Sequence, residues 1–510
     1  MPEEGDEEMT TRQRNGLRQR ALGHDPGRPG YVPLGLLLLT VTMGMMSVFL
    51  SGCTSLPSKI PSPLPDPRHL QYRPLELHLP KVERKKLKNN MVLYLLPDHE
   101  IPIINISVLI RTGSIYEPSD KIGLGELTGE VMRTGGTASL SPAELDEELE
   151  FHSIHVSTSI GRDSGQASLS VLTKDVDRGM ELFFDVLRNP AFQLDKVDLA
   201  KQKKTEEIRR KNDSPQNIAF REFRKILYKG DPRGNEAHIE DIQKLTREDM
   251  IWFHGRYFHP DNLILGISGD FLKEEIIEKL EKLTAGWEPL PKPVPQPPVP
   301  RGPASKTVNF ISKQIPQSII LMGGMAPAKS HPDYFAFSVL NDILGGGGFN
   351  SYLAEEIRSD RGLAYSVGSF HTGYKDYGVF GAYCFTGSSH THLVTSLMYQ
   401  ILNRVKLGQI TSEKLQWAKD SILNQFVFSF SSSDGLVGQL MSLEYHDLPR
   451  DYLDTFQENI RKVSLADVQR VAGNYLEPEK YILLVLGNDD HFDQSLTQFG
   501  PINVINIENY

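Results

Sequence analysis

Residues 123–137 read GLGELTGEVMRTGGT, a helix-like stretch whose side chains limit the chemistry open to this chain. A helix that holds catalytic zinc needs two imidazole ligands on successive turns and a carboxylate base beside them. This stretch contains no histidine, and Glu126, Gly129 and Glu130 stand where such groups would be needed. The helix therefore lacks both the ligands and the base of a zinc hydrolase.

Histidines elsewhere form three close pairs, none of which predicts a metal site. The first pair lies on a segment predicted as a strand, where residues i and i+3 face opposite sides. The second pair flanks a predicted helix end, and the third lies in a polar stretch predicted to be a solvent-facing loop. The pairs are His152 and His155, His254 and His259, and His390 and His392. We predict structural or surface roles for all six.

The first 52 residues predict export and lipid attachment. An arginine-bearing segment precedes a mostly apolar run at residues 31–50, the pattern of a secretory signal. The ending LSGC resembles a bacterial lipobox, which implies cleavage before Cys53 and a lipid on its sulfur. A plain transmembrane anchor is the alternative, since about 20 apolar residues can span a bilayer. Residues 53–80 would form a tether, and Thr54 after the cysteine favours an outer membrane facing the periplasm.

The net charge and the cysteine content argue against some classes of partner and of enzyme. The formal net charge of −10 argues against nucleic acid as a partner. Cys384 is the only cysteine after Cys53, so no intrachain disulfide can brace the folded part. In an apparent strand, Cys384 is expected to be a buried apolar residue, and the absence of a G-x-S-x-G motif argues against a serine hydrolase.

An internal repeat organises the chain. Residues 241–270 align without a gap on residues 459–488, at a constant offset of 218 positions. Each copy predicts a helix capped by Thr246 or Ser464, a Tyr-x-x-Pro break, and a buried strand. Two copies this far apart indicate a duplicated domain, because solenoid repeats recur every 20 to 50 residues or so.

Composition marks the boundary between the copies. Eight of the fifteen residues at 289–303 are proline, which favours a stiff extended linker at 288–306. The predicted domains are therefore 81–287 and 307–510. Strands are expected at 91–96, 103–111, 307–311 and 318–324, and a helix with a capping box at 141–150. We predict an α+β fold of two homologous α/β-sandwich domains.

Several motifs in both halves carry a family resemblance. They are Thr112-Gly113-Ser114 with Glu117 and Gly123; VLRNPAF at 186–192; YFHPDN at 257–262; and GGGGFNS at 345–351, leading into Arg358 and RGLAYSV at 361–367. With them the chain resembles the pitrilysin/insulinase family of inverted-motif zinc peptidases. The resemblance is to the short two-domain branch that includes mitochondrial processing peptidase. It implies that family's fold of two processing-peptidase-like domains.

The resemblance also implies where a metal site would be. In active members an H-x-x-E-H motif falls at the positions of Glu126, Gly129 and Glu130, and a later glutamate ligand at Glu207. One surviving ligand cannot hold catalytic zinc, so we predict no metal in this chain and zinc in a partner subunit. An all-oxygen site of the three glutamates for Mg²⁺ or Ca²⁺ is an alternative. The simpler interpretation is a solvated helix face with two repelling glutamates.

The second domain of such proteins carries an arginine–tyrosine pair, which matches Arg361 and Tyr365. Guanidinium and phenol both donate hydrogen bonds, so together they can hold a peptide carbonyl. The alternative is that the arginine caps nearby carbonyls and the tyrosine fills a core edge. The glycine run at 345–348 lacks the Lys-Ser/Thr of a phosphate loop and suits close approach of a peptide, or a hinge.

Three functions follow from these expectations. The first is a lipid-anchored, non-catalytic subunit that pairs with a zinc-bearing family member and contributes Arg361 and Tyr365 to a shared peptide chamber. The second is a stand-alone scaffold lipoprotein that binds peptide or protein. The third, an active metallopeptidase with an unusual carboxylate site, depends on Glu207 alone.

Overall fold

The computed structural model describes residues 79–290, 293–302 and 307–507. Residues 75–510 cluster as one compact unit. The predicted signal segment, the tether up to residue 78 and the lipidation site Cys53 lie outside the described residues. Within the described part, none of the helices combines the length and the apolar character needed to cross a bilayer.

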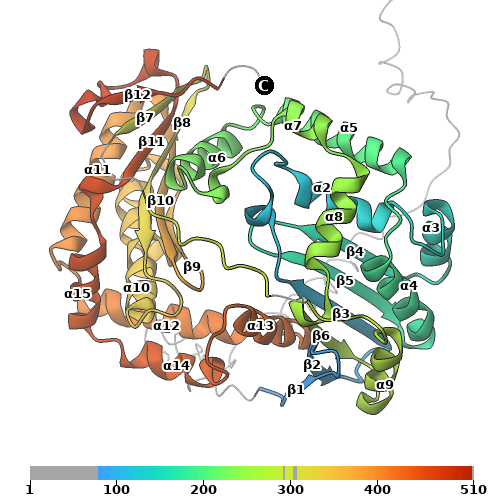
Figure 1. The fold of residues 1–510 in the computed structure, drawn as a ribbon. Helices are drawn as coiled ribbons and strands as arrows, with labels where there is room; N and C mark the ends of the chain where they lie inside the picture. The colour runs from blue at the N-terminus through green and yellow to red at the C-terminus, as the bar shows by residue number, and fades with distance from the viewer. Residues whose placement is uncertain (1–78, 291–292, 303–306, 508–510) are drawn as a thin grey trace, which may run out of the picture. The chain divides into compact units, whose positions relative to one another are not determined.

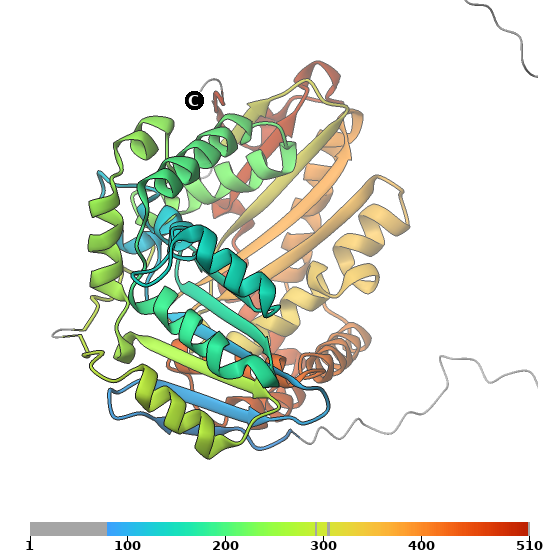
Figure 2. The same cartoon turned by 90° about the vertical axis from the view of Figure 1, so that its right-hand side faces the viewer.

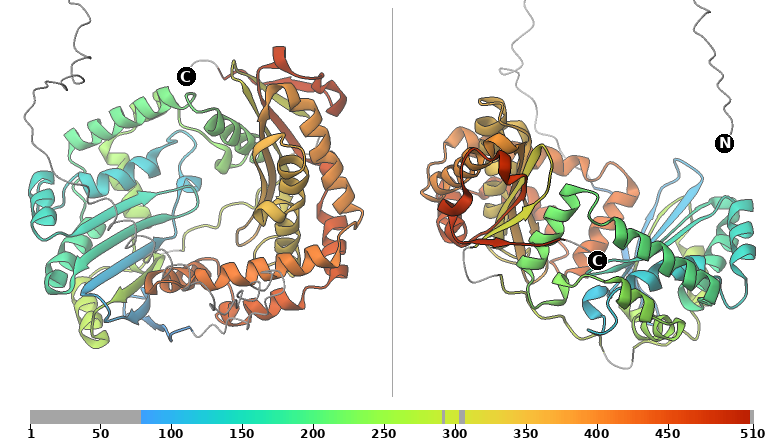
Figure 3. Two further views of the ribbon diagram at one scale, coloured as in Figure 1. Left: turned by 180° about the vertical axis from the view of Figure 1, so that it is seen from behind. Right: turned by 90° about the horizontal axis from the view of Figure 1, so that it is seen from above.

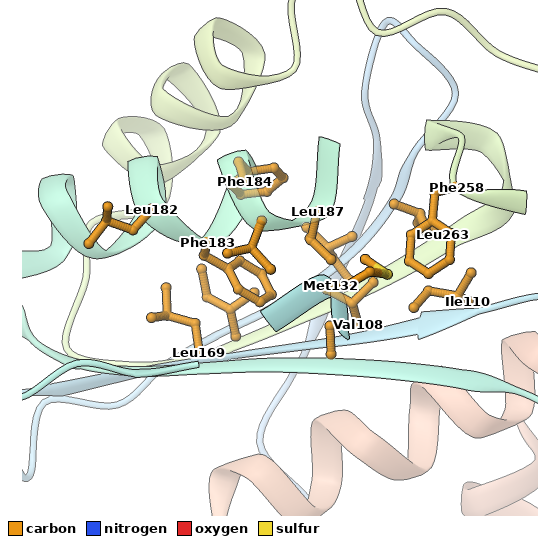
Figure 4. Packing of buried hydrophobic residues seen from close by; sticks show 14 of the residues in the cluster. Val108, Ile110, Met132, Leu169, Leu182, Phe183, Phe184, Leu187, Phe258 and Leu263 are labelled. Carbon is orange, nitrogen blue, oxygen red and sulfur yellow. The ribbon is translucent and has the colours of Figure 1, made fainter. Parts of the chain in front are cut away.

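The first half builds a six-stranded mixed sheet in the order β1-β2-β6-β3-β5-β4. β2 runs parallel to β6, and the other neighbours are antiparallel. Alternate residues of β3, among them Val108 and Ile110, point into a core that also holds Phe183 (Figure 4). The strands are β1 Glu83–Lys86, β2 Val92–Pro97, β3 Ile103–Ile110, β4 His155–Ile160, β5 Gly165–Leu172 and β6 Leu263–Gly269.

The second half repeats this sheet in the order β12-β7-β11-β8-β10-β9 (Figure 1). β7 is parallel to β11, as β2 is to β6. The two sheets differ only in one outer strand, because β1 is antiparallel to β2 whereas β12 is parallel to β7. The four strands predicted from the sequence correspond to β2, β3, β7 and β8. The strands are β7 Val308–Ser312, β8 Gln317–Ala326, β9 Ala364–Gly373, β10 Gly378–Gly387, β11 Ile482–Gly487 and β12 Ile502–Val504.

The helices follow the same duplication. The offset of 218 carries α5 onto α12, α6 onto α13 and α8 onto α15, residue for residue. The capping box predicted for α3 is confirmed at Ser141, and the predicted caps Thr246 of α8 and Ser464 of α15 also form capping boxes. The helices of the first half are α2 Leu124–Thr134, α3 Pro142–Phe151, α4 Val176–Arg188, α5 Leu194–Arg210, α6 Pro215–Leu227, α7 Ile239–Lys244, α8 Arg247–Tyr257 and α9 Lys273–Leu283. Those of the second half are α10 Tyr334–Asn341, α11 Thr391–Lys406, α12 Ser412–Phe428, α13 Ser433–Tyr445, α14 Tyr452–Lys462 and α15 Leu465–Tyr475.

One face of each sheet is covered by helices of its own half, and the opposite face is covered by one helix of the other half. α2 and α4 pack on one face of the first sheet (Figure 2), and α13 of the second half packs against β2, β3 and β6. In return α6 packs against β8 and β11 (Figures 1 and 3). Gly266 permits this contact, because a Cβ atom there would lie 2.3 Å from side-chain atoms of Val437 and Met441. The two halves therefore share apolar clusters and are expected to unfold together.

Arg233 joins three parts of this unit. Its guanidinium pairs with Asp231 at 3.0 Å, lies 3.3 Å from Asp163, and donates to the Pro298 carbonyl of the linker. It also lies 4.9 Å from the ring centroid of Tyr377 in the second half. Arg233 is 4 % exposed, so a buried cation links the first half, the linker and the second half.

Candidate functional site

The start of α2 is held in place by Glu117. Its carboxylate accepts hydrogen bonds from the main-chain N–H groups of Gly123, at 2.9 Å, and Gly125, at 2.7 Å. Gly123 precedes the helix with φ of 94°, a left-handed conformation that glycine adopts without strain. A carboxylate at a helix start satisfies N–H groups that have no partner within the helix and complements the helix dipole. Glu117 thereby fixes the position of α2 and of the glutamates it carries.

α2 lies directly on the edge strand β4 at Gly129. A Cβ atom built on Gly129 would lie 2.5 Å from the main-chain nitrogen of Ile160 and 2.8 Å from the carbonyl carbon of Ser159. The Thr158 hydroxyl also donates to the Gly129 carbonyl at 2.6 Å. A side chain at position 129 would therefore clash with the backbone of β4. The close contact between α2 and β4 leaves no room for the side chain of a catalytic base.

Two lysines of α5 neutralise the glutamates of the degenerate motif. Lys204 Nζ lies 2.6 Å from Glu126 Oε1 and 3.0 Å from Glu207 Oε2. Lys203 Nζ lies 3.3 Å from Glu130 Oε1. An ammonium group thus stands between two of the carboxylates that the family resemblance places around a metal. The lysines were missed by the sequence analysis, although their i, i+3 and i+4 spacing to Glu207 on one helix was a visible signal.

These residues do not fit a metal ion. Burial alone would lower the pKa of Lys204, but its hydrogen bonds to Glu126 and Glu207 raise that pKa above the usual value, so the ammonium stays charged. A dication among these carboxylates would have to displace this cation. Among the described residues, no group of three or more His, Cys, Asp or Glu side chains is arranged to hold a metal. We therefore derive no reaction step through zinc, Mg²⁺ or Ca²⁺ in this chain.

A cleft of about 740 Å³ opens beside these charges. It is lined by Glu117, Glu126, Glu130, Lys204 and Glu207, together with β4 and the loop that follows it. A second cavity, of about 630 Å³, lies on the sheet face and shares Ser157, Ser159 and Arg162 with the first. Seryl hydroxyls from β3, β4 and β5 line this second cavity, and α13 and the β9–β10 turn border it. The two cavities thus meet around the edge strand β4.

Glu117 is expected to make stability depend on pH. Burial raises its pKa to about 7, although the two N–H groups of Gly123 and Gly125 oppose the shift. The folded state then holds a proton more tightly than the unfolded state, so stability contributed at low pH is lost as pH rises from about 4.5 to 7. The loss is at most about 3 kcal/mol. The Glu117→Gln variant should not show this pH-dependent loss of stability.

The measurement is urea unfolding of both proteins between pH 5 and 8. Subtracting the variant's free energy of unfolding from that of the wild type cancels other titrating groups, such as His254, whose pKa burial lowers to about 4. The difference should fall with rising pH. A difference that stays flat across this range would show that Glu117 is ionised throughout.

Tyr365 projects from the edge strand β9 and is 81 % exposed. The guanidinium of Arg358, not that of Arg361, lies over its ring, 5.3 Å from the centroid, and also lies 4.5 Å from the ring centroid of Phe349. Arg361 instead donates to the main-chain oxygen of Glu356 at 2.6 Å. Among the described residues the Arg358 N–H groups have no acceptor. The structure thus pairs Tyr365 with an arginine that the sequence analysis named only within a family motif and gave no role.

The glycine run at 345–348 serves packing at two of its positions. A Cβ atom on Gly345 would lie 2.4 Å from the Ser369 nitrogen of β9, and one on Gly347 would meet the Trp417 ring at 2.1 Å. Gly345 thus seats a helical turn on the edge strand of the second half, as Gly129 does in the first. Gly348, with φ of 72° and open space around it, remains suited to close approach of a ligand.

The predictions for two histidines need correction. His152 ends α3 instead of lying on a strand, and its ring pairs with Asp175 at 3.0 Å. His392 is not in a solvent-facing loop, because α11 begins at Thr391 and buries it against Phe499, with ring centroids 5.0 Å apart. Cys384 is fully buried, as predicted.

The comparison with known sequences finds two family profiles in this chain. The profile described as Insulinase (Peptidase family M16) matches residues 94–238, and Peptidase M16 inactive domain matches residues 244–422. An uncharacterized zinc protease of Rickettsia bellii is 25% identical over 342 residues, which are 66% of this chain and 81% of that protein. Zinc protease PqqE of Helicobacter pylori is 24% identical over 412 residues, 78% of this chain and 91% of that protein.

Solved structures share the fold. A peptidase M16 inactive domain from Pseudomonas fluorescens superposes with a TM-score of 0.74 at 21% identity, covering 80% of this chain and 98% of the other. A protease from Helicobacter pylori gives a TM-score of 0.72 at 23% identity, covering 80% and 100%. The two profiles, which together span more than half of the sequence, show that the chain belongs to the insulinase/pitrilysin-type M16 peptidase family.

Proposed function

We propose that this chain is the non-catalytic, lipid-anchored subunit of a heteromeric M16 metalloendopeptidase, and that it binds peptide beside a zinc-bearing partner subunit. The observation that carries the proposal is the replaced metal site. An ammonium group lies between Glu126 and Glu207, and Gly129 seats its helix on β4 where a base would be needed. The chain keeps the fold and an open cleft without the means to activate water.

The cleft offers groups that suit an extended polypeptide. β4 is the outermost strand of its sheet, and an outer strand can pair its free N–H and C=O groups with a peptide backbone. The adjoining cavity presents Ser157, Ser159, Ser168 and Gln166, which are uncharged donors and acceptors. Such a wall accepts many side chains, as a subunit that holds peptide for another active site requires.

The second half contributes hydrogen-bond donors at its own edge strand and just before it. The Arg358 guanidinium lies over the Tyr365 ring, and among the described residues its N–H groups have no acceptor. A guanidinium in contact with two aromatic rings is partly preorganised, so it loses less freedom when it binds a carbonyl or carboxylate. We assign these donors, with Arg361, to substrate held near the partner's zinc.

The envelope location is part of the proposal and rests on the sequence alone. A lipid on Cys53 would hold the protein at a membrane, and the residue after it favours the outer membrane facing the periplasm. Radiolabelled palmitate incorporated by the wild type and absent from Cys53→Ala would support it. Labelling that persists in the variant would contradict it.

The deciding experiment is coexpression with a short family member from the same host that retains H-x-x-E-H. Peptidase activity is measured for each protein alone and for both together. We expect a copurifying pair that cleaves peptides, with this chain inactive alone. A chain that binds peptide without copurifying would be the stand-alone scaffold instead.

The stacked arginine gives the pair a specific test. Arg358→Ala should lower kcat/KM of the reconstituted pair by about tenfold or more, because removing one positioned donor commonly costs that much. Arg361→Ala should lower it less, since that side chain already donates to the Glu356 carbonyl. Assembly, measured by size-exclusion chromatography, should be unchanged in both. Unaltered turnover in Arg358→Ala and in Tyr365→Phe would return both residues to a structural role.

A further inference from the structure

The outer edge of the first sheet carries a dense group of lysines. Lys81, Lys85, Lys86 and Lys88 are all exposed and lie within eight residues, on and beside the edge strand β1 (Figure 1). Arg84, between them, is turned inward and held by Glu444 at 2.7 Å. Lys88 approaches Glu281 at 3.4 Å, and among the described residues no carboxylate pairs with the other three lysines. This group, the β1 lysines, is a local concentration of positive charge in a chain of net charge −10.

Protection of a sheet edge explains only part of this group. Lysines on an outer strand discourage pairing with another chain. That role suits Lys85 and Lys86, which lie within β1, but not Lys81 and Lys88, which lie outside it. Lys85 and Lys86 are neighbours on the strand and point to opposite faces of the sheet, so the four lysines flank this edge on both sides and extend beyond the strand itself.

The described part of the chain begins at the same edge. Leu79, the first described residue, and Val82 pack against an apolar cluster of the folded unit. The β1 lysines therefore follow directly on the start of the described chain, and long side chains that carry an ammonium group suit a lipid headgroup region.

We propose that this edge of the sheet, with the β1 lysines on both of its faces, rests on an anionic membrane. Cys53 lies about 25 residues before Leu79, so a lipid there would keep the folded unit within about 90 Å of the bilayer. Lysines so confined meet the headgroups at high effective concentration. The proposal concerns orientation on the membrane and does not depend on a peptidase partner.

The test uses residues 75–510 without lipid, the compact unit, with phosphatidylcholine vesicles that hold either no anionic lipid or about 30 % phosphatidylglycerol. Cosedimentation should occur with the anionic vesicles only, and should weaken when salt rises from about 50 to 500 mM. Replacing the β1 lysines with glutamine should lower the partition coefficient at least about tenfold.

A charge-matched control separates this surface from a general charge effect. It replaces four exposed lysines elsewhere, Lys174, Lys229, Lys462 and Lys480, with glutamine. The control should bind anionic vesicles like the wild type. Equal losses in both variants, or equal binding of the wild type to neutral vesicles, would overturn the proposal. Either result leaves the pairing proposal standing, because pairing is read from copurification and peptidase activity.

Discussion

Gly129→Glu, which returns a carboxylate to the position of a catalytic base, is expected to lower the free energy of unfolding by about 3 kcal/mol or more, or to prevent folding. The built Cβ atom of residue 129 lies 2.5 Å from the Ile160 nitrogen, and a strand backbone cannot yield as a flexible side chain can. The carboxylate would also be pressed between α2 and β4. Urea unfolding followed by circular dichroism measures the loss.

Gly255 offers the matched control. It lies inside α8, is exposed, and has no atom within 4 Å of a built Cβ. Gly255→Ala should stabilise the protein by up to about 1 kcal/mol, because alanine favours the helix. If Gly129→Glu unfolds at the same urea concentration as the wild type, α2 does not rest on β4 as described.

Arg233→Ala is expected to cost about 3 to 5 kcal/mol, the usual penalty for removing one partner of a buried ion pair. Asp231 would keep its burial and lose the bond to Arg233 Nη1. Burial raises the pKa of Asp163 and Arg233 opposes that shift, so the variant should leave Asp163 with a still higher pKa. The contacts to Pro298 and Tyr377 would be lost as well. Differential scanning calorimetry should show one transition at a lower Tm.

Arg209 is the control for charge removal. Its side chain is 57% exposed and pairs with Glu206 on the same helix. Arg209→Ala should change stability by less than about 0.5 kcal/mol, as is usual for exposed pairs. Equal stability of Arg233→Ala and Arg209→Ala would show that Arg233 does not bind the halves together.

The sequence predicted the fold well because its signals are local or repeated. Capping boxes at Ser141, Thr246 and Ser464 fix helix starts through contacts three residues apart, and a reader of the chain can see them. The offset of 218 revealed the duplication, since residues that pack alike are repeated alike. The sequence did not reveal that α6 and α13 each pack on the sheet of the other half. The apolar face of an amphipathic helix shows that the helix is buried against something, but not which sheet it covers.

The candidate site was predicted only where it depends on residue type. Missing histidines at 126 and 130 are visible in the sequence, but the ammonium of Lys204 between two glutamates is a contact across helices. The sequence does not show whether Arg358 or Arg361 lies closer to Tyr365. They precede Tyr365 by seven and four residues, in a part of the chain that turns from helix to strand, so their spacing does not fix which side chain reaches the ring. His392 was assigned to a loop because HTH at 390–392 follows the polar stretch TGSS, and nothing in this segment indicates that Phe499 covers the ring.

The central claim, that this chain keeps the M16 fold without a zinc site, is tested most directly by metal analysis. The protein is purified, incubated with excess zinc, passed through a desalting column and measured by inductively coupled plasma mass spectrometry. We expect less than about 0.1 zinc per chain, because α2 carries no imidazole and the ammonium group of Lys204 lies between Glu126 and Glu207. One tightly held zinc per chain would contradict the account.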